Sequence, residues 1–224
     1  MKTLGILGGI GPEASSYFYA EVIRRLRESG AIRRNTDYPQ IFINSINAPE
    51  LVSLEVTDEL LEPYARGIIE LASLKPDYIV MVCNTIHLFR ERLIRASDYE
   101  KISDLSQIVG AALAHMPGTT CVVGTAATVT SGLYHVPGRI YTNPDDTQLA
   151  EIGNIVISYN ASGEVENNRA ALQRIIQERH IAGADIFIAG CTEISELLRG
   201  VKGFTILDTL ELIIQDTVQR IQTI

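Results

Sequence analysis

Short apolar runs alternate with longer segments of helical pattern along the 224-residue chain, and this alternation constrains the fold more than any other feature. The run Tyr78–Val82 is apolar throughout, which is typical of a parallel strand covered on both faces. Leu61, Tyr64 and Ile68 recur at helical spacing in the segment before it. We therefore predict an α/β protein with mainly parallel sheets. The expected strands are residues 4–7, 41–46, 78–82, 121–123, 139–141, 185–189 and 204–207, and the expected helices include 14–28, 60–74, 147–158, 166–182 and 210–221.

The two halves of the chain repeat this order of elements. In each half the first strand ends at a glycine-containing turn, at Gly8 and Gly124, and a later apolar strand ends at a cysteine with a threonine close behind it. We predict two pseudo-symmetric three-layer α/β lobes, joined by a hinge and enclosing one cleft. The first lobe is expected to comprise residues 1–104 plus 205–224, because the last strand and helix are too short to form a domain, and the second to comprise 105–204.

Charge and cysteine content exclude several classes of protein. The chain has 27 acidic against 19 basic residues, a net charge of −8, which argues against binding to nucleic acid or to a membrane through a basic patch. Its apolar runs are far shorter than the roughly 18 residues of a membrane span, and Met1–Gly8 is interpreted as a first strand, not a signal peptide. Three widely spaced cysteines fit neither a disulfide framework nor a zinc motif, so we expect a reducing cytoplasm.

Two of the cysteines stand where ligands of α/β proteins usually bind. Cys83 and Cys191 each follow an apolar strand at the turn into an expected helix, whereas Cys121 lies inside a strand and is interpreted as a buried apolar residue. A helix N-terminus favours the thiolate form. Two thiols on opposite walls of a cleft suit inversion of a carbon stereocentre, in which one base removes the Cα proton and an acid on the other face returns one. A disulfide relay is the competing use, but no C-x-x-C motif is present.

The order of motifs resembles that of the aspartate/glutamate racemase superfamily, in particular its cofactor-independent aspartate racemase branch. The matching stretches are residues 7–12, 83–87, Gly124-Thr125 with Thr128, 131–134 and 190–194. The resemblance implies Cys83 and Cys191 as the acid/base pair, no PLP and no metal. It implies a small amino acid as substrate, and we expect a homodimer. The residues expected to bind the substrate are Gly9, Ile10, Asn84, Thr85, Thr125, Thr128, Thr192 and Glu193.

Two positions depart from that branch. Leu51 stands where an arginine commonly holds the side-chain carboxylate of the substrate, and Glu166 or a neighbour stands where a lysine is often found. Arg33, Arg34 or Arg139 could substitute. We expect aspartate to remain a substrate, with weak discrimination against other small amino acids. The Gly8-Gly9 turn and the segment Asn47–Thr57 are expected to move when the ligand binds.

Three alternatives remain open from the residues alone. Cys83 with His87 four residues later could serve a hydrolase or lyase, although such a histidine equally often satisfies nearby backbone groups. A catalytically idle protein that binds small acids would keep the same cleft. Residues 9–14 also fit the G-x-G-x-x-A fingerprint of dinucleotide binding, but no acidic residue closes the second strand at Asn44-Ser45.

Overall fold

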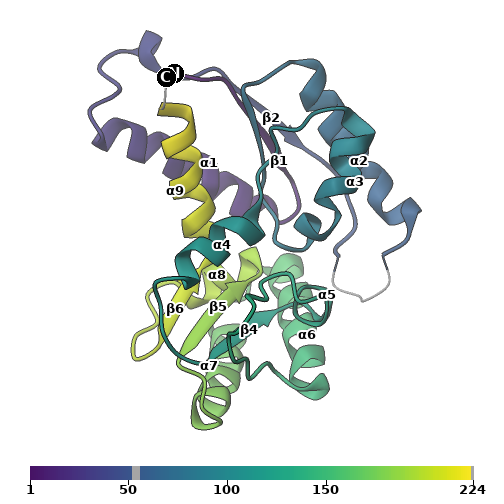
Figure 1. Ribbon diagram of the computed structural model, residues 1–224, viewed down its shortest axis with the longest axis vertical. Helices are drawn as coiled ribbons and strands as arrows, with labels where there is room; N and C mark the ends of the chain where they lie inside the picture. The colour runs from purple at the N-terminus through teal and green to yellow at the C-terminus, as the bar shows by residue number, and fades with distance from the viewer. Residues whose placement is uncertain (52–55, 223–224) are drawn as a thin grey trace. The chain divides into compact units, whose positions relative to one another are not determined.

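The computed structural model describes residues 1–51 and 56–222, and these form two compact units (Figure 1). The first unit contains Met1–Glu50, Val56–Leu105 and the chain from Leu210 onward, and the second contains Leu51 and Ser106–Thr209. Each unit has its own parallel sheet, so the predicted fold class of two α/β lobes is confirmed. None of the helices in the described ranges is long and apolar enough to cross a membrane.

The sheet of the first unit has the order β2-β1-β3, with all pairs parallel. Its strands are β1 (Leu4–Gly8), β2 (Ile41–Ser45) and β3 (Tyr78–Met81), and Leu7 of the central strand is level with Asn44 and Met81. The strands β1 and β3 are buried along their whole length, as their apolar composition predicts. The other elements are α1 (Pro12–Glu28), η1 (Asn35–Asp37), α2 (Asp58–Ser73), η2 (Thr85–Phe89), α3 (Arg90–Ser97) and α9 (Thr209–Gln222).

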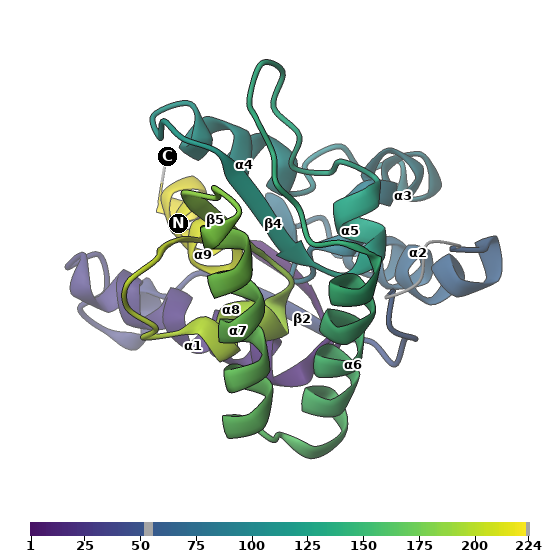
Figure 2. The same ribbon diagram turned by 90° about the horizontal axis from the view of Figure 1, so that it is seen from below.

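The sheet of the second unit has the order β4-β5-β6 and is also parallel throughout. Its strands are β4 (Thr120–Gly124), β5 (Ile186–Gly190) and β6 (Thr205–Asp208). The helices are α4 (Leu105–Leu113), α5 (Ala126–Thr130), α6 (Asp146–Ser162), α7 (Glu166–Ile181) and α8 (Thr192–Leu198). Figure 2 shows α6 and α7 as neighbours, and their apolar side chains join β4 and β5 in one core that includes Ile152, Ile175 and Phe187.

Single parallel bridges extend both sheets and make the internal repeat visible. Ile102 bridges to Ile79 on the outer side of β3, and Tyr141 bridges to Thr120 on the outer side of β4. In each unit the first strand therefore lies between the second and the third, and the fourth follows the third. The strand expected at residues 139–141 is thus present only as this one bridge.

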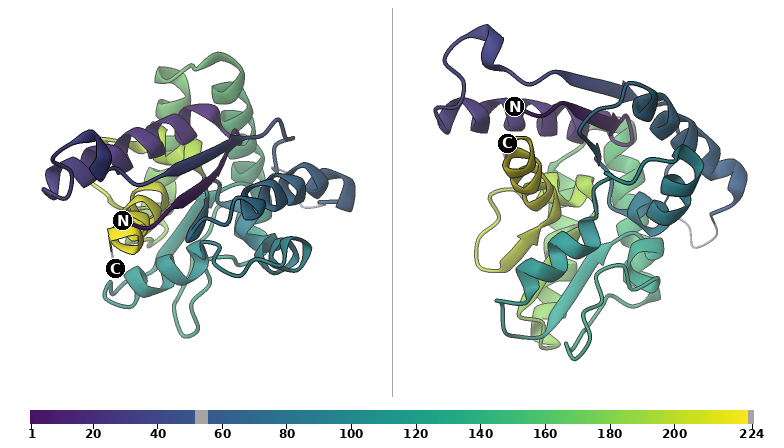
Figure 3. Two further views of the ribbon diagram at one scale, coloured as in Figure 1. Left: turned by 90° about the horizontal axis from the view of Figure 1, so that it is seen from above. Right: turned by 45° about the horizontal axis from the view of Figure 1, so that its top comes forward.

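The expectation that the last strand returns to the first lobe is wrong. The strand β6 pairs with β5, with Leu207 level with Ile188, because it is the fourth strand of the second repeat. Only α9 returns, from Leu210. Its end lies beside the start of β1 in both views of Figure 3, where Lys2 N–H donates to Ile221 O at 3.0 Å. The helix α4 follows the fourth strand position of the first repeat and belongs, from Ser106, to the second unit. Each repeat thus gives its last helix to the other unit.

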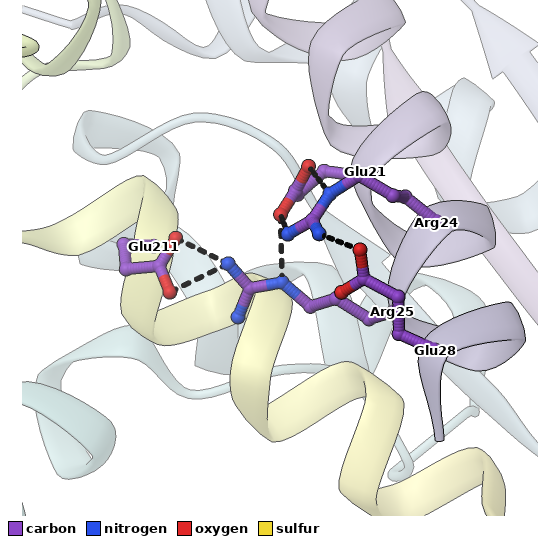
Figure 4. Close-up of polar contacts among 5 residues, drawn as sticks. All are labelled: Glu21, Arg24, Arg25, Glu28 and Glu211. Carbon is purple, nitrogen blue, oxygen red and sulfur yellow. Dashed lines mark hydrogen bonds and ion pairs between the residues drawn. The ribbon is translucent and has the colours of Figure 1, made fainter. Parts of the chain in front are cut away.

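Arg24 and Arg25 of α1 are paired with carboxylates (Figure 4). Arg24 donates to Glu21 and Glu28 along the same helix, and Arg25 donates to Glu21 and, at 2.6 Å, to Glu211 of α9. The hydrogen bond from Arg24, reinforced by that from Arg25, lowers the pKa of the buried Glu21 to about 2. This network joins the returning helix α9 to α1.

Candidate active site

A tight turn leaves the carboxyl end of β1 and contains Gly9 and Ile10. Gly9 has φ +85°, and a Cβ atom there would lie 2.3 Å from the backbone oxygen of Ile46, so only glycine fits. The N–H of Gly9 donates to Ser15 Oγ at 3.0 Å, and Ser15 Oγ donates to Gly11 O at 3.1 Å. Ser15, one turn into α1, therefore holds the glycine turn. Sequence analysis missed Ser15, because its role depends on the path of the turn.

Cys83 follows the neighbouring strand β3 and lies next to this turn. Leu7 is level with Met81, and Val82 N–H still donates to Leu7 O at 3.0 Å, so Gly9 and Cys83 are each two residues beyond a register pair. The Cys83 side chain is half-buried, and the neighbouring Asn84 and Thr85 are buried. The expected α-helix does not begin directly after Cys83. The chain forms the 3-10 helix η2 first, and α3 begins at Arg90, so a helix dipole acts less directly on this thiol than predicted.

The side chain of His87 forms hydrogen bonds with backbone groups. It is buried, its Nδ1 accepts from Leu105 N–H at 3.2 Å, and its Nε2 lies 3.3 Å from Met81 O. Because Nδ1 is an acceptor, Nε2 carries the proton and donates to Met81 O. Burial lowers the pKa of His87 to about 4, so the ring is neutral near pH 7. Both ring nitrogens are therefore committed to main-chain groups, which decides between the two interpretations of this residue.

In the second unit, Cys191 and Glu193 form a hydrogen-bonded pair. Cys191 directly follows β5 and is the N-cap residue of α8, as the sequence predicts. Its Sγ donates to Glu193 Oε2 at 2.7 Å, and Thr192 Oγ1 donates to the same oxygen at 2.9 Å. All three side chains are buried. The carboxylate therefore orients the thiol.

The adjacent strand β4 brings two threonines to the same edge of this sheet. Gly124 is level with Gly190, so Thr125 and Cys191 follow directly after a register pair. The strands come so close that a Cβ at Gly124 would lie 2.9 Å from Gly190 O. Thr125 caps α5, accepting from Thr128 N–H, and its hydroxyl lies 3.2 Å from that of Thr128. Small polar groups thus surround Cys191 within its own unit.

Cys121 has the structural role that the sequence predicts. It lies within β4, is fully buried in the core, and burial raises the pKa of its thiol to about 12. A thiol of this kind stays protonated and unreactive near neutral pH.

Neither of the two positions that depart from the racemase pattern, Leu51 and Glu166, carries a cation. Leu51 is buried, and Glu166 is exposed at the start of α7. The Arg139 guanidinium donates to four groups of its own unit, namely the carbonyls of Gly118, Leu113 and Met116 and the hydroxyl of Thr120. Arg34 is exposed and pairs with Asp37. Of the segment Asn47–Thr57, residues 52–55 lie outside the described residues.

Two α/β units of matching topology, each with a cysteine at the carboxyl end of its third strand, define a duplicated protein with one such thiol in each half. A model of the Asp/Glu/Hydantoin racemase family matches residues 7–217. The chain therefore belongs to the Asp/Glu/Hydantoin racemase family, and this membership supports an amino-acid racemase.

Individual relatives agree with this family. The chain is 24% identical, over 96% of each sequence, to the broad specificity amino-acid racemase RacX of Bacillus subtilis (strain 168). Among solved structures it is similar to the aspartate racemase of Picrophilus torridus, with a TM-score of 0.76, 20% identity and coverage of 98% of this chain and 94% of that one. It is also similar to an aspartate racemase homologue from Pyrococcus horikoshii OT3, with a TM-score of 0.71, 23% identity and coverage of 98% and 99%. At these identities the structures share the fold.

Proposed function

We propose that the protein is a cofactor-independent amino-acid racemase in which Cys83 and Cys191 act as acid and base on opposite faces of the substrate Cα. The observation that carries the proposal is their equivalence. Each cysteine follows the third strand of its repeat, beside the turn that ends the first strand. A reaction with two mirror-related steps needs two chemically similar groups, and a duplicated fold supplies them.

In this mechanism one cysteine, as thiolate, takes the Cα proton, and the other, as thiol, gives a proton to the opposite face of the carbanion. The bond from Cα to one hydrogen breaks as the bond to another forms, and the two cysteines exchange protonation states. The hydrogen bond from Cys191 to Glu193 suits the protonated member of the pair. Cys83 is then the base for that direction, and the roles reverse in the other direction.

The neighbouring polar groups are proposed to hold the amino and α-carboxyl groups of the substrate. These are the backbone at Gly9 and Ile10 and the side chains of Asn84, Thr85, Thr125, Thr128, Thr192 and Glu193. The side chain of the substrate meets no arginine at position 51, where Leu51 is buried. A second carboxylate is poorly held in a desolvated site without a cation. We therefore propose a small amino acid as substrate, aspartate included, with weak discrimination.

Incubation of a panel of amino acids with the enzyme in D₂O tests the proposal. A racemase incorporates deuterium at Cα and removes optical rotation, a hydrolase or lyase releases a new product, and a binding protein does neither. Cys83→Ser and Cys191→Ser should each lower racemisation by at least about 100-fold, the typical contribution of a positioned acid or base. Retained Cα proton exchange in one of these two variants is consistent with the mechanism, because abstraction from one face needs a single base.

Cys121→Ser is the matched control and should leave turnover largely intact. Loss of activity in this variant without unfolding would mean that the wrong pair of cysteines has been assigned. The same panel tests the substrate. A preference for aspartate over neutral amino acids of more than about 100-fold in kcat/KM, about 2.7 kcal/mol, would show that a cation holds the second carboxylate. The interpretation of Leu51 as a lost contact would then be wrong.

The hydrolase or lyase alternative needs His87 to act on the thiol of Cys83. Both ring nitrogens of His87 bind backbone groups, so this alternative loses its main support.

A further inference from the structure

Tyr64 is a buried phenol that binds the segment preceding Leu51. It lies in the second turn of α2, is fully buried, and its hydroxyl donates to the carbonyl oxygen of Pro49. Pro49 belongs to the stretch Ala48–Leu51, where the side-chain contact of related racemases is expected. A helix of the first unit therefore holds the main chain of this stretch at Pro49.

The packing of α2 places Tyr64 near the carboxyl edge of the first sheet. A Cβ at Gly5 would touch Leu71, and a Cβ at Gly67 would touch Leu7, so α2 runs opposite to β1. Tyr64 is three residues before Gly67, about 4.5 Å further along the helix axis. It thus reaches the level at which Gly9 and Cys83 leave their strands.

The electrostatics of Tyr64 agree with this placement. Burial is the largest cause that raises the pKa of its hydroxyl above the usual value, and the nearby negative charges of the Cys83 thiolate and Glu50 raise it further. The hydroxyl therefore stays protonated across the working range of pH. It can donate a hydrogen bond there, but it does not exchange protons with a substrate.

We propose that Tyr64 is a positioning residue that holds the segment 48–50 beside Cys83 within the first unit and thereby sets which substrate side chains the site accepts. This inference rests on the proposed racemase function. With the hydroxyl in place, the segment is fixed before the substrate binds. Without it, each substrate must order the segment on binding, which weakens binding and reduces the differences between side chains.

Tyr64→Phe is the variant that tests the inference, because it removes the hydroxyl and keeps the ring in the core. We expect KM to rise about five- to tenfold, which corresponds to the loss of one neutral hydrogen bond, while kcat changes less than about threefold. The ratio of kcat/KM between aspartate and alanine should move towards unity. A fall in kcat with KM and the ratio unchanged would overturn the positioning role.

Tyr99→Phe is the matched control. Tyr99 also donates to a proline carbonyl, that of Pro76, in the same unit but at the opposite end of β3. This variant should leave KM and the substrate ratio unchanged.

Hydrogen exchange of the amides of Asn47, Ala48, Glu50 and Leu51, measured without substrate, gives a readout independent of turnover. Their exchange should accelerate in Tyr64→Phe and remain as in the wild type in Tyr99→Phe, and equal exchange in all three proteins would overturn the inference. Suppose that the wild type exchanges Cα protons and that Tyr64→Phe leaves KM and the ratio of kcat/KM between aspartate and alanine unchanged. The role of Tyr64 is then wrong, while the proposed racemase function stands. If the wild type exchanges none, the proposed function fails, and the amide exchange still decides whether Tyr64 holds the segment.

Discussion

Buried polar side chains beside the candidate site differ in what they bind. Glu193 accepts hydrogen bonds from the Cys191 thiol and the Thr192 hydroxyl, so it acts on a proposed catalytic group. His87 follows Cys83 by four residues, as Glu193 follows Cys191 by two, yet it binds Met81 O and Leu105 N–H. It thereby joins the end of β3 to the start of α4. The same kind of neighbourhood in the sequence thus has a chemical role in one repeat and a structural role in the other.

The neutral, buried state of His87 predicts how stability depends on pH. Its pKa is about 4 in the folded protein against 6.5 in the unfolded chain, so the unfolded state binds more protons between these values. Stability is therefore complete above pH 6.5 and falls as the pH falls towards 4. We expect the free energy of unfolding to decrease by about 2 kcal/mol between pH 6.5 and pH 5, measured by urea denaturation.

His87→Gln should be less stable at pH 7 but should lose this component of the pH dependence. His115 is exposed, and His115→Gln should follow the wild-type profile. An unchanged slope in His87→Gln would show that His87 is not held neutral.

At the scale of elements, the ends of neighbouring strands position the candidate residues within each unit. In the first unit the turn after β1 is held from three sides. Ser15 binds the backbone of Gly9 and Gly11, Ile46 N–H donates to Gly8 O, and the backbone at Ile46 leaves no space for a side chain at Gly9. These contacts fix the path of the turn in the structure.

Gly9→Ala should destabilise the protein much more than the same change at Gly30. Both residues have positive φ, +85° and +74°, but a Cβ at Gly30 meets nothing within 4 Å. Gly30→Ala should cost about 1 to 2 kcal/mol for the backbone conformation alone. Gly9→Ala adds a clash with Ile46 and should cost at least about 3 kcal/mol. Thermal and urea unfolding of the two variants measure the difference, and equal costs would show that the turn can relax.

At the scale of the whole molecule, the chain contains the same four-strand arrangement twice, and the last helix of each repeat belongs to the other unit. The helix α9 is bound to the first unit by Arg25 with Glu211 and by Tyr78 with Asp216. The C-terminal end of α4 is held in the second unit by Arg139, which donates to Leu113 O at 2.6 Å. Neither repeat therefore completes its unit with its own residues.

Truncation of a buried side chain in α9 should weaken the sheet of the first unit, and truncation in α4 should weaken the sheet of the second unit. Ile214 of α9 and Val109 of α4 are both fully buried. Ile214→Ala should cost about 2 to 4 kcal/mol and accelerate amide hydrogen exchange in β1 and β3. Val109→Ala should cost about 2 kcal/mol and accelerate exchange in β4 and β5. If both variants accelerate exchange in the same sheet, the assignment of these helices to the two units is wrong.

The positions of most strands and long helices could be predicted from the sequence, because burial leaves a local pattern. The predicted helix 14–28 is α1 (Pro12–Glu28), and the apolar run at 185–189 is β5 (Ile186–Gly190). Cys83 and Cys191 were found for the same reason, since each follows such a run. The short helix α4 was not predicted, and the bounds of α3, the helix expected after Cys83, were not predicted either. The nine residues of α4 and the eight residues of α3 span too few turns for the periodic pattern to stand out.

Long-range partners were decided by the tertiary structure alone. The sequence determined that residues 205–208 form a strand, but not that the strand joins β5, because pairing depends on which sheet edge the preceding chain reaches. It likewise left the partner of His87 open and showed Tyr64 only as part of an apolar helix face. Hydrogen bonds from these side chains to Met81 and Pro49 cross 6 and 15 residues of chain, and no periodic signal records them. Local patterning therefore determined the elements and the cysteines, whereas the register of distant segments decided what each buried polar group binds.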